Sequence, residues 1–244
     1  MERYELTPIG NFGDYSVGPH TSWYRIDGKI MYLFDVPYSN VGWAMSKVGQ
    51  STLHSIEQVT IFITSLKETR IGGLKTFIDI LQAMGMPRWM TFIPNDIWMK
   101  ASNYLEIVGA SLADCHLMRG DYYQDDNVQV FPREVGHDGI LRSFAYVVYG
   151  GDLFIDQTGN NWSIYYSPDN RVFTDESVLA SFLERPAEKT IYHDITTNID
   201  DETHCYKDRV IKPIEKKLRS HIYPINIDDP KDARKFKTLG FNIA

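Results

Sequence analysis

Apolar residues follow two different periods along this chain, so the pattern predicts both strands and helices. Runs rich in aromatic and β-branched residues lie on both sides of Asp27-Gly28, a pair typical of a tight β-hairpin turn. A continuous apolar run over residues 59–63 predicts a buried strand. A helix is expected after Gly72-Gly73, because the apolar residues beyond this pair recur at the spacing of one helical face.

The same signals predict further elements along the rest of the chain. Residues 89–93 are predicted to form a strand, followed by a helix to about residue 105 with Asn95 or Asp96 as its N-cap. In the second half we expect strands at 128–131, 143–149, 161–167, 189–193 and 221–226, and helices at 175–183, 208–218 and 230–237. Two β-rich halves, each followed by helices, fit an α/β fold, although the pattern alone does not single out how the sheets are arranged.

Composition favours one globular domain that spans residues 1–244. Hydrophobic residues make up 43% of the chain and charged residues 23%, as in ordinary globular proteins. The net charge of -7 argues against generic nucleic-acid binding, although it is compatible with a local basic pocket. Cys115 and Cys205 are too few and too far apart for a disulfide framework or a cysteine-type zinc site. Without a signal core or a membrane-spanning run, we expect a cytoplasmic protein with no membrane partner.

The most informative stretch runs from Thr64 to Leu74, between the predicted strand and the predicted helix. It reads Thr-Ser-Leu-Lys-Glu-Thr-Arg-Ile-Gly-Gly-Leu. This frame resembles the metal-binding loop of metallo-β-lactamase-fold hydrolases, which reads Thr-His-x-His-x-Asp-His-x-Gly-Gly-Leu. The resemblance implies an αββα four-layer sandwich. The positions of the family's metal ligands are taken in this chain by Ser65, Lys67, Thr69 and Arg70.

Later segments resemble further landmarks of the same family, in the same order. His137 stands where the family has its third ligand histidine, and Asp169 where it has the metal-bridging aspartate. Asn226 stands at the position of the last ligand histidine. His193 and His204 resemble a histidine loop of the transfer-RNA-processing and cyclic-nucleotide-cleaving members. That loop contacts phosphate or donates a proton there, so these two histidines are the candidates for catalysis.

The altered positions predict that a conventional dinuclear metal centre is missing. Two divalent metals that share a water need about six protein ligands. Only His137 and Asp169 remain at the family's ligand positions, and Lys67 and Arg70 would repel a cation. We therefore expect no cofactor, and zinc or manganese only if the protein is an active enzyme.

Two interpretations of the altered site remain open. Lys67 or Arg70 forms an ion pair with Asp169, because a buried carboxylate without a partner is costly. Alternatively, these residues form an anion pocket in which an arginine donates two hydrogen bonds to a phosphate. The residues of that pocket are Lys67, Arg70, His137, Asp169, His193 and His204.

The resemblance leans toward the branch of ribonuclease Z and the phage anti-Pycsar phosphodiesterases, which cleave cyclic pyrimidine nucleotides. It implies a catalytically degenerate protein that binds a nucleotide, another phosphate-containing ligand or a protein partner without hydrolysis. The expected form is a homodimer, located in the host cytoplasm if a phage encodes it. One alternative is an active metal-dependent phosphodiesterase acting on cyclic nucleotides. Another is a structural or assembly protein, which would bind no nucleotide.

Two weaker candidates lie near the N-terminus. His20 could border the site, because the family places its opening hairpin there. Aromatic residues between positions 23 and 43 could stack on a nucleobase, although such residues more often form core or interface. They are Trp23, Tyr24, Tyr32, Phe34, Tyr38 and Trp43.

Overall fold

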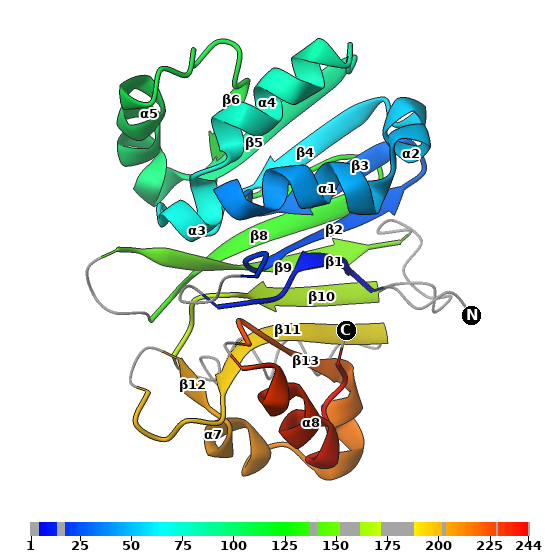
Figure 1. The fold of residues 1–244 in the computed structure, drawn as a ribbon, viewed down its shortest axis with the longest axis vertical. Helices are drawn as coiled ribbons and strands as arrows, with labels where there is room; N and C mark the ends of the chain where they lie inside the picture. The colour runs from blue at the N-terminus through cyan, green and yellow to red at the C-terminus, as the bar shows by residue number, and fades with distance from the viewer. Residues whose placement is uncertain are drawn as a thin grey trace. The chain divides into compact units, whose positions relative to one another are not determined.

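The computed structural model describes residues 5–13, 18–136, 141–151, 162–171, 188–201, 204–227 and 229–243 (Figure 1). Contacts between Cα atoms divide the chain into two compact units. The N-terminal unit comprises Leu6–Asp121, and the C-terminal unit comprises Tyr122–Ala244 together with Met1–Glu5. Each unit contains its own sheet, so the two are described separately. The expectation that residues 1–244 form one domain stays a prediction.

The N-terminal unit contains a six-stranded sheet with the order β1-β2-β3-β4-β5-β6. The first three strands pair antiparallel, and β3 to β6 pair parallel. The predicted hairpin is confirmed, with Gly28 at a φ of 58° in its turn. The strands are β1 (Thr7–Gly10), β2 (Ser22–Asp27), β3 (Ile30–Phe34), β4 (Gln58–Phe62), β5 (Arg88–Pro94) and β6 (Leu117–Gly120).

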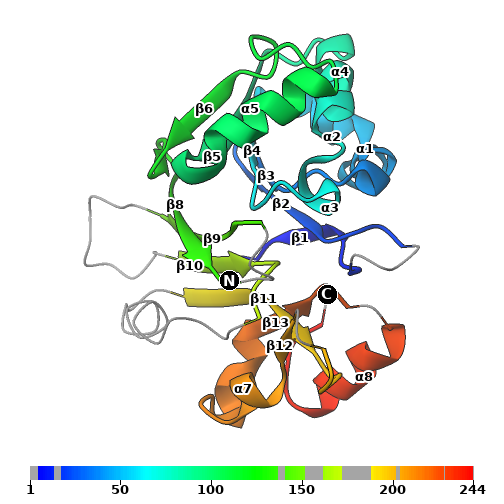
Figure 2. The same ribbon diagram turned by 90° about the vertical axis from the view of Figure 1, so that its left-hand side faces the viewer.

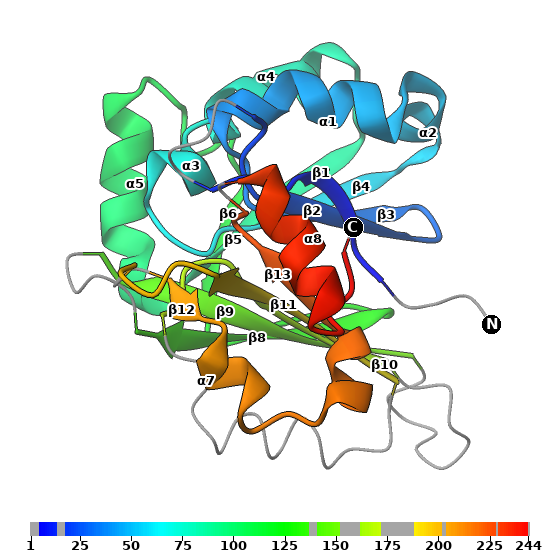
Figure 3. The ribbon, with the colours of Figure 1, turned by 60° about the horizontal axis from the view of Figure 1, so that its bottom comes forward.

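Helices connect the parallel strands of this sheet, as right-handed crossovers require. Figures 1 and 3 show α1 and α4 on the same face of the sheet. The helix predicted after Gly72-Gly73 is confirmed as α4, with Leu74, Phe77, Ile78 and Leu81 buried. The helical elements are η1 (Tyr38–Asn40), α1 (Val41–Val48), α2 (Gln50–Ser55), α3 (Glu68–Ile71), α4 (Leu74–Ala83), η2 (Asn95–Ile97) and α5 (Trp98–Ile107).

The predicted N-cap of the helix beyond residue 95 is wrong. The 3₁₀ turn η2 precedes α5, and Ile97 takes the N-cap position without a side-chain cap bond. Asn95 instead donates from Nδ2 to Oδ1 of Asp121 at 2.6 Å. The side chain is therefore engaged by a residue 26 positions away, which local sequence signals do not reveal.

The C-terminal unit contains a seven-stranded sheet with the order β12-β11-β10-β9-β8-β7, in which β13 also pairs with β11. Strands β7, β8, β9 and β10 pair antiparallel, each with the next. Strands β10, β12 and β13 each pair parallel with β11. The strands are β7 (Tyr123–Gln124), β8 (Val128–Val135), β9 (Ser143–Gly150), β10 (Trp162–Ser167), β11 (Glu188–Thr196), β12 (Cys205–Tyr206) and β13 (Ile222–Ile225).

Helices of the C-terminal unit follow the last strands (Figure 2). They are α7 (Asp208–Ile211), η3 (Lys216–His221) and α8 (Pro230–Thr238). The helix predicted over residues 208–218 is thus divided, with Pro213 between its two parts, because proline disfavours a continuous helix. The helix predicted over residues 175–183 lies outside the described residues. Asp229 caps α8 by accepting a hydrogen bond from the backbone of Lys231.

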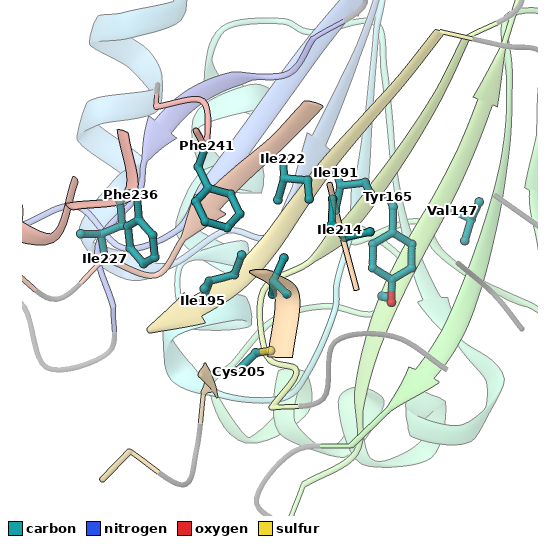
Figure 4. Packing of buried hydrophobic residues seen from close by; sticks show 12 residues of the cluster. Val147, Tyr165, Ile191, Ile195, Cys205, Ile214, Ile222, Ile227, Phe236 and Phe241 are labelled. Carbon is teal, nitrogen blue, oxygen red and sulfur yellow. The ribbon is translucent and has the colours of Figure 1, made fainter. Parts of the chain in front are cut away.

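The core of the C-terminal unit lies between its sheet and these helices (Figure 4). Apolar side chains of β10, β11 and β13 meet side chains from α7, α8 and the chain beyond α8. They include Tyr165, Ile191, Ile195, Cys205, Val210, Ile222, Phe236 and Phe241, all at most 4% exposed. Packing on this face orients the strands and fixes where their carboxyl ends lie. Among the described residues, no helix is long and apolar enough to cross a membrane.

Candidate functional site

Asp35 organises the loop that follows β4 in the N-terminal unit. It lies directly after β3 at a φ of 61°, a region that a short polar side chain tolerates better than most. Its buried carboxylate accepts hydrogen bonds from the backbone N–H of Thr64 at 2.8 Å and from the Thr64 hydroxyl. The Asp35 N–H donates to the Phe62 carbonyl, while the Ser22 hydroxyl donates to the Asp35 carbonyl. Asp35 therefore joins the ends of β3 and β4.

The same carboxylate faces the guanidinium of Arg70. Nε of Arg70 lies 3.8 Å from Oδ2 of Asp35, and both side chains are 0% exposed. Nη1 of Arg70 donates to the Thr69 carbonyl at 3.0 Å. Burying a guanidinium is favourable only when a carboxylate and further acceptors compensate it. The charged Arg70 side chain is therefore part of the packed interior of this loop.

Lys67 carries the second positive charge of the loop. It occupies the N-cap position of α3, and its side chain is partly exposed. Ser65, which precedes it, is fully buried, and its hydroxyl accepts a bond from the Lys67 N–H at 3.4 Å. A lysine in this position can reach a ligand in a way that a fully buried arginine cannot.

The donor set of this loop does not fit a divalent metal. Zinc and manganese take neutral imidazoles, thiolates or carboxylates, whereas Ser65, Lys67, Thr69 and Arg70 supply hydroxyls and cations. The Asp35 carboxylate, which is directed at the loop, is hydrogen-bonded to Thr64 and paired with Arg70. Within the described part of the chain, no group of three or more histidine, cysteine or acidic side chains is arranged to hold a metal ion.

The carboxyl ends of parallel strands form a second polar region, in the C-terminal unit. Strands β10, β11 and β13 run parallel, so their carboxyl ends lie at one edge of the sheet (Figure 2). Ser167 pairs in register with His193, and Asp194 with Ile225. The polar residues buried at this edge are Ser167, Asp169, Asn170, His193, Asp194, His204 and Asn226.

Asp194 and His204 form the closest ionisable pair at this edge. Nδ1 of His204 lies 2.6 Å from Oδ2 and 2.7 Å from Oδ1 of Asp194, with both side chains at most 6% exposed. The His204 N–H also donates to Asp201 Oδ1 at 3.2 Å, and Nε2 lies 3.9 Å from Asp201 Oδ2. The Asp194 carboxylate accepts a hydrogen bond from Nδ1 of His204 and so orients the imidazole. Such a pair can hold or donate a proton.

Two further residues complete the edge. His193 donates from Nδ1 to the Asp194 carbonyl at 2.9 Å, because a carbonyl oxygen can only accept, and its ring stacks on Tyr165. Asn226 has a φ of 59° and donates from Nδ2 to the Pro168 carbonyl. That bond orients the Asn226 side chain at the end of β13 and joins it to the segment that carries Asp169.

The structure distributes the predicted site residues between the two units. Lys67 and Arg70 lie together in the loop of the N-terminal unit, while His193 and His204 lie together at the strand edge of the C-terminal unit. Asp169, 1% exposed, belongs to that same edge. His137 lies outside the described residues. The predicted ion pair between the loop and Asp169 therefore stays a prediction, while the loop's guanidinium is already paired with Asp35.

Sequence reasoning missed Asp35 and Asp194, the two acids that organise these regions. Each lies at the end of a predicted strand or directly after it, and an acid at that position indicates a site at the end of the strand.

The exposed fractions of the side chains also separate the aromatic candidates. Tyr38 and Trp43 are 67% and 50% exposed, while three of the others are fully buried. The buried ones are Trp23, Tyr32 and Phe34.

No protein-family model and no curated protein matches this sequence. Several solved structures are similar to it over almost the whole chain. The metallo-beta-lactamase fold protein YhfI from Bacillus subtilis has a TM-score of 0.67 at 11% identity, covering 98% of this chain and 95% of its own. A diphosphatase from the PhnP family has a TM-score of 0.69 at 15% identity, covering 98% and 93%.

The short form of human tRNase Z is similar as well, with a TM-score of 0.54 at 16% identity, covering 96% of this chain and 88% of its own. Identities this low establish the fold alone. The α/β fold class predicted from the sequence is confirmed by these structures and by the two mixed sheets with their helices. The chain therefore has the metallo-β-lactamase fold.

Proposed function

We propose that this protein is a catalytically degenerate member of the metallo-β-lactamase fold that binds a phosphate-containing ligand, a nucleotide in particular, without a dinuclear metal centre. The loop after β4 is the binding element. The negatively charged group of the ligand lies where metal ions would otherwise bind. A homodimer remains our proposal for the assembled form.

The observation that carries this proposal is the buried ion pair between Arg70 and Asp35. Asp35 compensates the charge of the guanidinium, so the pair contributes a fixed loop conformation rather than a net charge. The pairing with Asp35 and the bonds from Asp35 to Thr64 hold the loop in one conformation. A loop held in this way presents the ammonium group of Lys67 at its partly exposed position, which favours an anion and disfavours a metal cation.

Lys67 supplies the contact that the ligand can reach. It is partly exposed at the N-cap of α3, next to the buried Arg70. A lysine acts on phosphate as a point charge with three donors. The diphosphatase and the tRNase among the similar structures act, by their names, on phosphate-containing molecules. That likeness supports phosphate as the ligand group here.

A thermal-shift panel tests the proposal with cyclic CMP, cyclic UMP, their linear monophosphates and inorganic phosphate. We expect at least one nucleotide to raise the melting temperature increasingly with concentration. Lys67→Ala should remove most of that shift. Lys75→Ala is the matched control, since Lys75 lies in the same unit on α4 and pairs with Asp79 at the surface. A panel without any specific shift, or a shift that Lys67→Ala leaves intact, would contradict the proposal.

Arg70→Ala is a poor probe of ligand contact in this protein. Removing the guanidinium leaves the Asp35 carboxylate buried without its partner cation, so a lost thermal shift would report unfolding as well as lost binding. Lys67 separates the two effects, because its side chain is only partly buried.

The pair of Asp194 and His204 favours a second function, an active phosphodiesterase. A protonated imidazole held by a buried carboxylate is suited to donate a proton to a leaving oxygen. Under this alternative, purified protein hydrolyses a cyclic nucleotide or bis-p-nitrophenyl phosphate with added zinc or manganese, and His204→Ala lowers the rate by about 100-fold or more. If the protein binds the nucleotide but hydrolyses no substrate in the presence of either zinc or manganese, the non-hydrolytic function is favoured.

A further inference from the structure

An edge strand of the N-terminal unit lies outside both regions described above. Among the described residues, β6 pairs with β5 alone, so its other side forms the open edge of the six-stranded sheet (Figure 2). The opposite edge strand, β1, contains Pro8 and a register shift, which both interrupt strand pairing. Strand β6 contains neither a proline nor a register shift. An edge without these features can pair with another strand.

The register of β6 shows which of its backbone groups face outward. The Thr91 N–H donates to the His116 carbonyl at 3.3 Å, and Thr91 lies opposite Leu117 in the parallel pairing. In a parallel pair, the backbone groups of alternate residues face the neighbouring strand. Those of His116 and Met118 therefore face β5, whereas those of Leu117 and Arg119 face outward. In the described part of the chain, these outward N–H and C=O groups have no hydrogen-bond partner.

Two charges of opposite sign stand two residues apart on this edge. Arg119 and Asp121 are both exposed, and neither forms an ion pair within the part of the chain that the structure describes. The guanidinium carbon of Arg119 lies 5.9 Å from the centroid of the Trp98 ring, and Asp121 accepts the hydrogen bond from Asn95. Trp98 belongs to α5 and Asn95 to η2, so neighbouring elements position both charges.

The order of these charges makes the edge complementary to a copy of itself. A two-fold axis at Gly120 sets two β6 strands antiparallel, with Arg119 of each copy opposite Asp121 of the other. An axis at Arg119 would instead bring two guanidinium groups face to face, which is unfavourable. Opposite charges directly across the two strands therefore stabilise one register. A contact of this symmetry closes on itself and gives a dimer rather than a filament.

Apolar and backbone groups favour the same pairing. Met118 in β6 is 40% exposed. A second copy seated on β6 covers apolar surface at Met118 and supplies partners for the outward N–H and C=O groups of Arg119. Charge of a single sign on an edge strand repels a copy of that strand, whereas Arg119 followed by Asp121 attracts one.

We infer that β6 is the interface of a homodimer, in which two copies pair antiparallel about Gly120 with reciprocal ion pairs between Arg119 and Asp121. The two six-stranded sheets then form one continuous sheet across the dimer. The inference rests on the homodimer proposed above and names its surface. It requires no ligand, so it can be tested apart from nucleotide binding.

Charge reversal tests the reciprocal ion pairs by sedimentation velocity at micromolar concentrations. Arg119→Asp places carboxylates opposite each other, and Asp121→Arg does the same with guanidinium groups, so each variant alone should self-associate about tenfold or more weakly. An equimolar mixture of the two variants restores opposite charges at both contacts and should form a heterodimer. Arg88→Asp, at an exposed arginine of β5, is the matched control and should dimerise as wild type.

A disulfide tests the position of the two-fold axis without altering the charges. Gly120 lies opposite itself in this pairing, where the two Cα atoms are about 4.5 Å apart, within the range that a disulfide spans. Gly120→Cys should therefore give a covalent dimer on a non-reducing gel. The native Cys115 and Cys205 are buried, and Arg88→Cys on β5 is the control that should stay a monomer on the same gel.

The outcomes separate this interface from the homodimer and from ligand binding. If wild-type protein is a monomer, the homodimer and the inference are both wrong, while nucleotide binding keeps its own test. If wild-type protein is a dimer, but both charge variants also dimerise or Gly120→Cys does not cross-link, the interface lies elsewhere and the inference is wrong. A mixture of the charge variants that fails to associate overturns it as well. A heterodimer formed only in the mixture, with a cross-link at position 120, supports it.

Discussion

The strand-end regions of the two units differ in how they treat charge. In the N-terminal unit, the loop after β4 carries Lys67 and a buried Arg70 that faces the acid Asp35. In the C-terminal unit, the edge of β10, β11 and β13 carries the acids Asp169 and Asp194 among imidazoles. One region is built from cations and hydroxyls, and the other from carboxylates and histidines. The two regions therefore suit ligands of different charge.

The loop of the N-terminal unit contains its own charge compensation. Arg70 has a carboxylate partner, and that carboxylate also anchors Thr64. We expect this loop to be important for folding, as its burial implies, and we expect the two units to respond independently.

Removing the acid of the rebuilt loop should have the largest effect. Asp35→Ala leaves the Arg70 guanidinium buried without its carboxylate and removes the acceptor of Thr64, which should cost about 3–5 kcal/mol in the free energy of unfolding. Urea denaturation measures this value. Asp79→Ala, which breaks an exposed pair with Lys75, should cost only about 0.5 kcal/mol or less. A cost below about 1 kcal/mol for Asp35→Ala would mean that the pair does not support the loop.

The free cysteines allow each unit to be followed separately. Cys115 lies in the N-terminal unit and Cys205 in the C-terminal unit, both buried. Burial raises the pKa of the Cys115 thiol, so its alkylation in the folded state should be slow. A local loss of about 3 kcal/mol in Asp35→Ala should accelerate Cys115 labelling on the order of 100-fold. Equal acceleration at Cys205, measured by mass spectrometry, would instead show that the two units unfold as one domain.

Breaking the pair in the C-terminal unit should have a smaller effect. His204→Ala leaves the Asp194 carboxylate buried without its imidazole, which should cost about 2–3 kcal/mol in unfolding free energy. His221→Ala is the control, since His221 is exposed and bonds only to the Lys189 carbonyl. If both variants unfold at the same urea concentration, the Asp194–His204 pair contributes nothing to the fold.

The smallest effect is expected at Lys207, on the surface of the C-terminal unit. A hydrogen bond from its ammonium group to Asp208, and a second one to Tyr206, raise the pKa of Lys207 above its ordinary value of 10.5. Because the folded-state pKa is the higher one, this stabilisation is present below pH 10.5 and lost as pH rises through the raised pKa. Lys207→Met should cost about 0.5 kcal/mol or less near neutral pH, and less still in strong alkali. If Lys207→Met costs as much unfolding free energy in strong alkali as near neutral pH, the hydrogen bonds of the ammonium group are not the origin of the stabilisation.

Sequence patterns predicted the elements whose signals are local. The hairpin around Gly28 and the amphipathic helix α4 follow from turn chemistry and from a 3.6-residue period, which neighbouring residues determine. Comparison with a family motif supplied the fold itself, and similar structures confirm it. Helix α1 was missed although Val41, Ala44 and Val48 recur at helical spacing, because the apolar residues Trp43 and Met45, which are not buried, obscure that period.

The contacts within the candidate site were less predictable, because they join residues far apart in the chain. Asp35 contacts Thr64 across 29 positions, and His20 contacts Ser39 across 19. Arg70 was recognised as an unusual cation, but Asp35 was not recognised as its partner. The sequence shows which charges are present, whereas only the packed strands show which of them meet.

Binding through cations of the loop, without metal ions, is tested most directly by calorimetric titration after exhaustive dialysis against a chelator. We predict that cyclic CMP binds chelator-treated protein as well as untreated protein, and that Lys67→Ala weakens both equally. Binding that disappears with the chelator and returns with stoichiometric zinc or manganese would contradict a ligand site that works without metal.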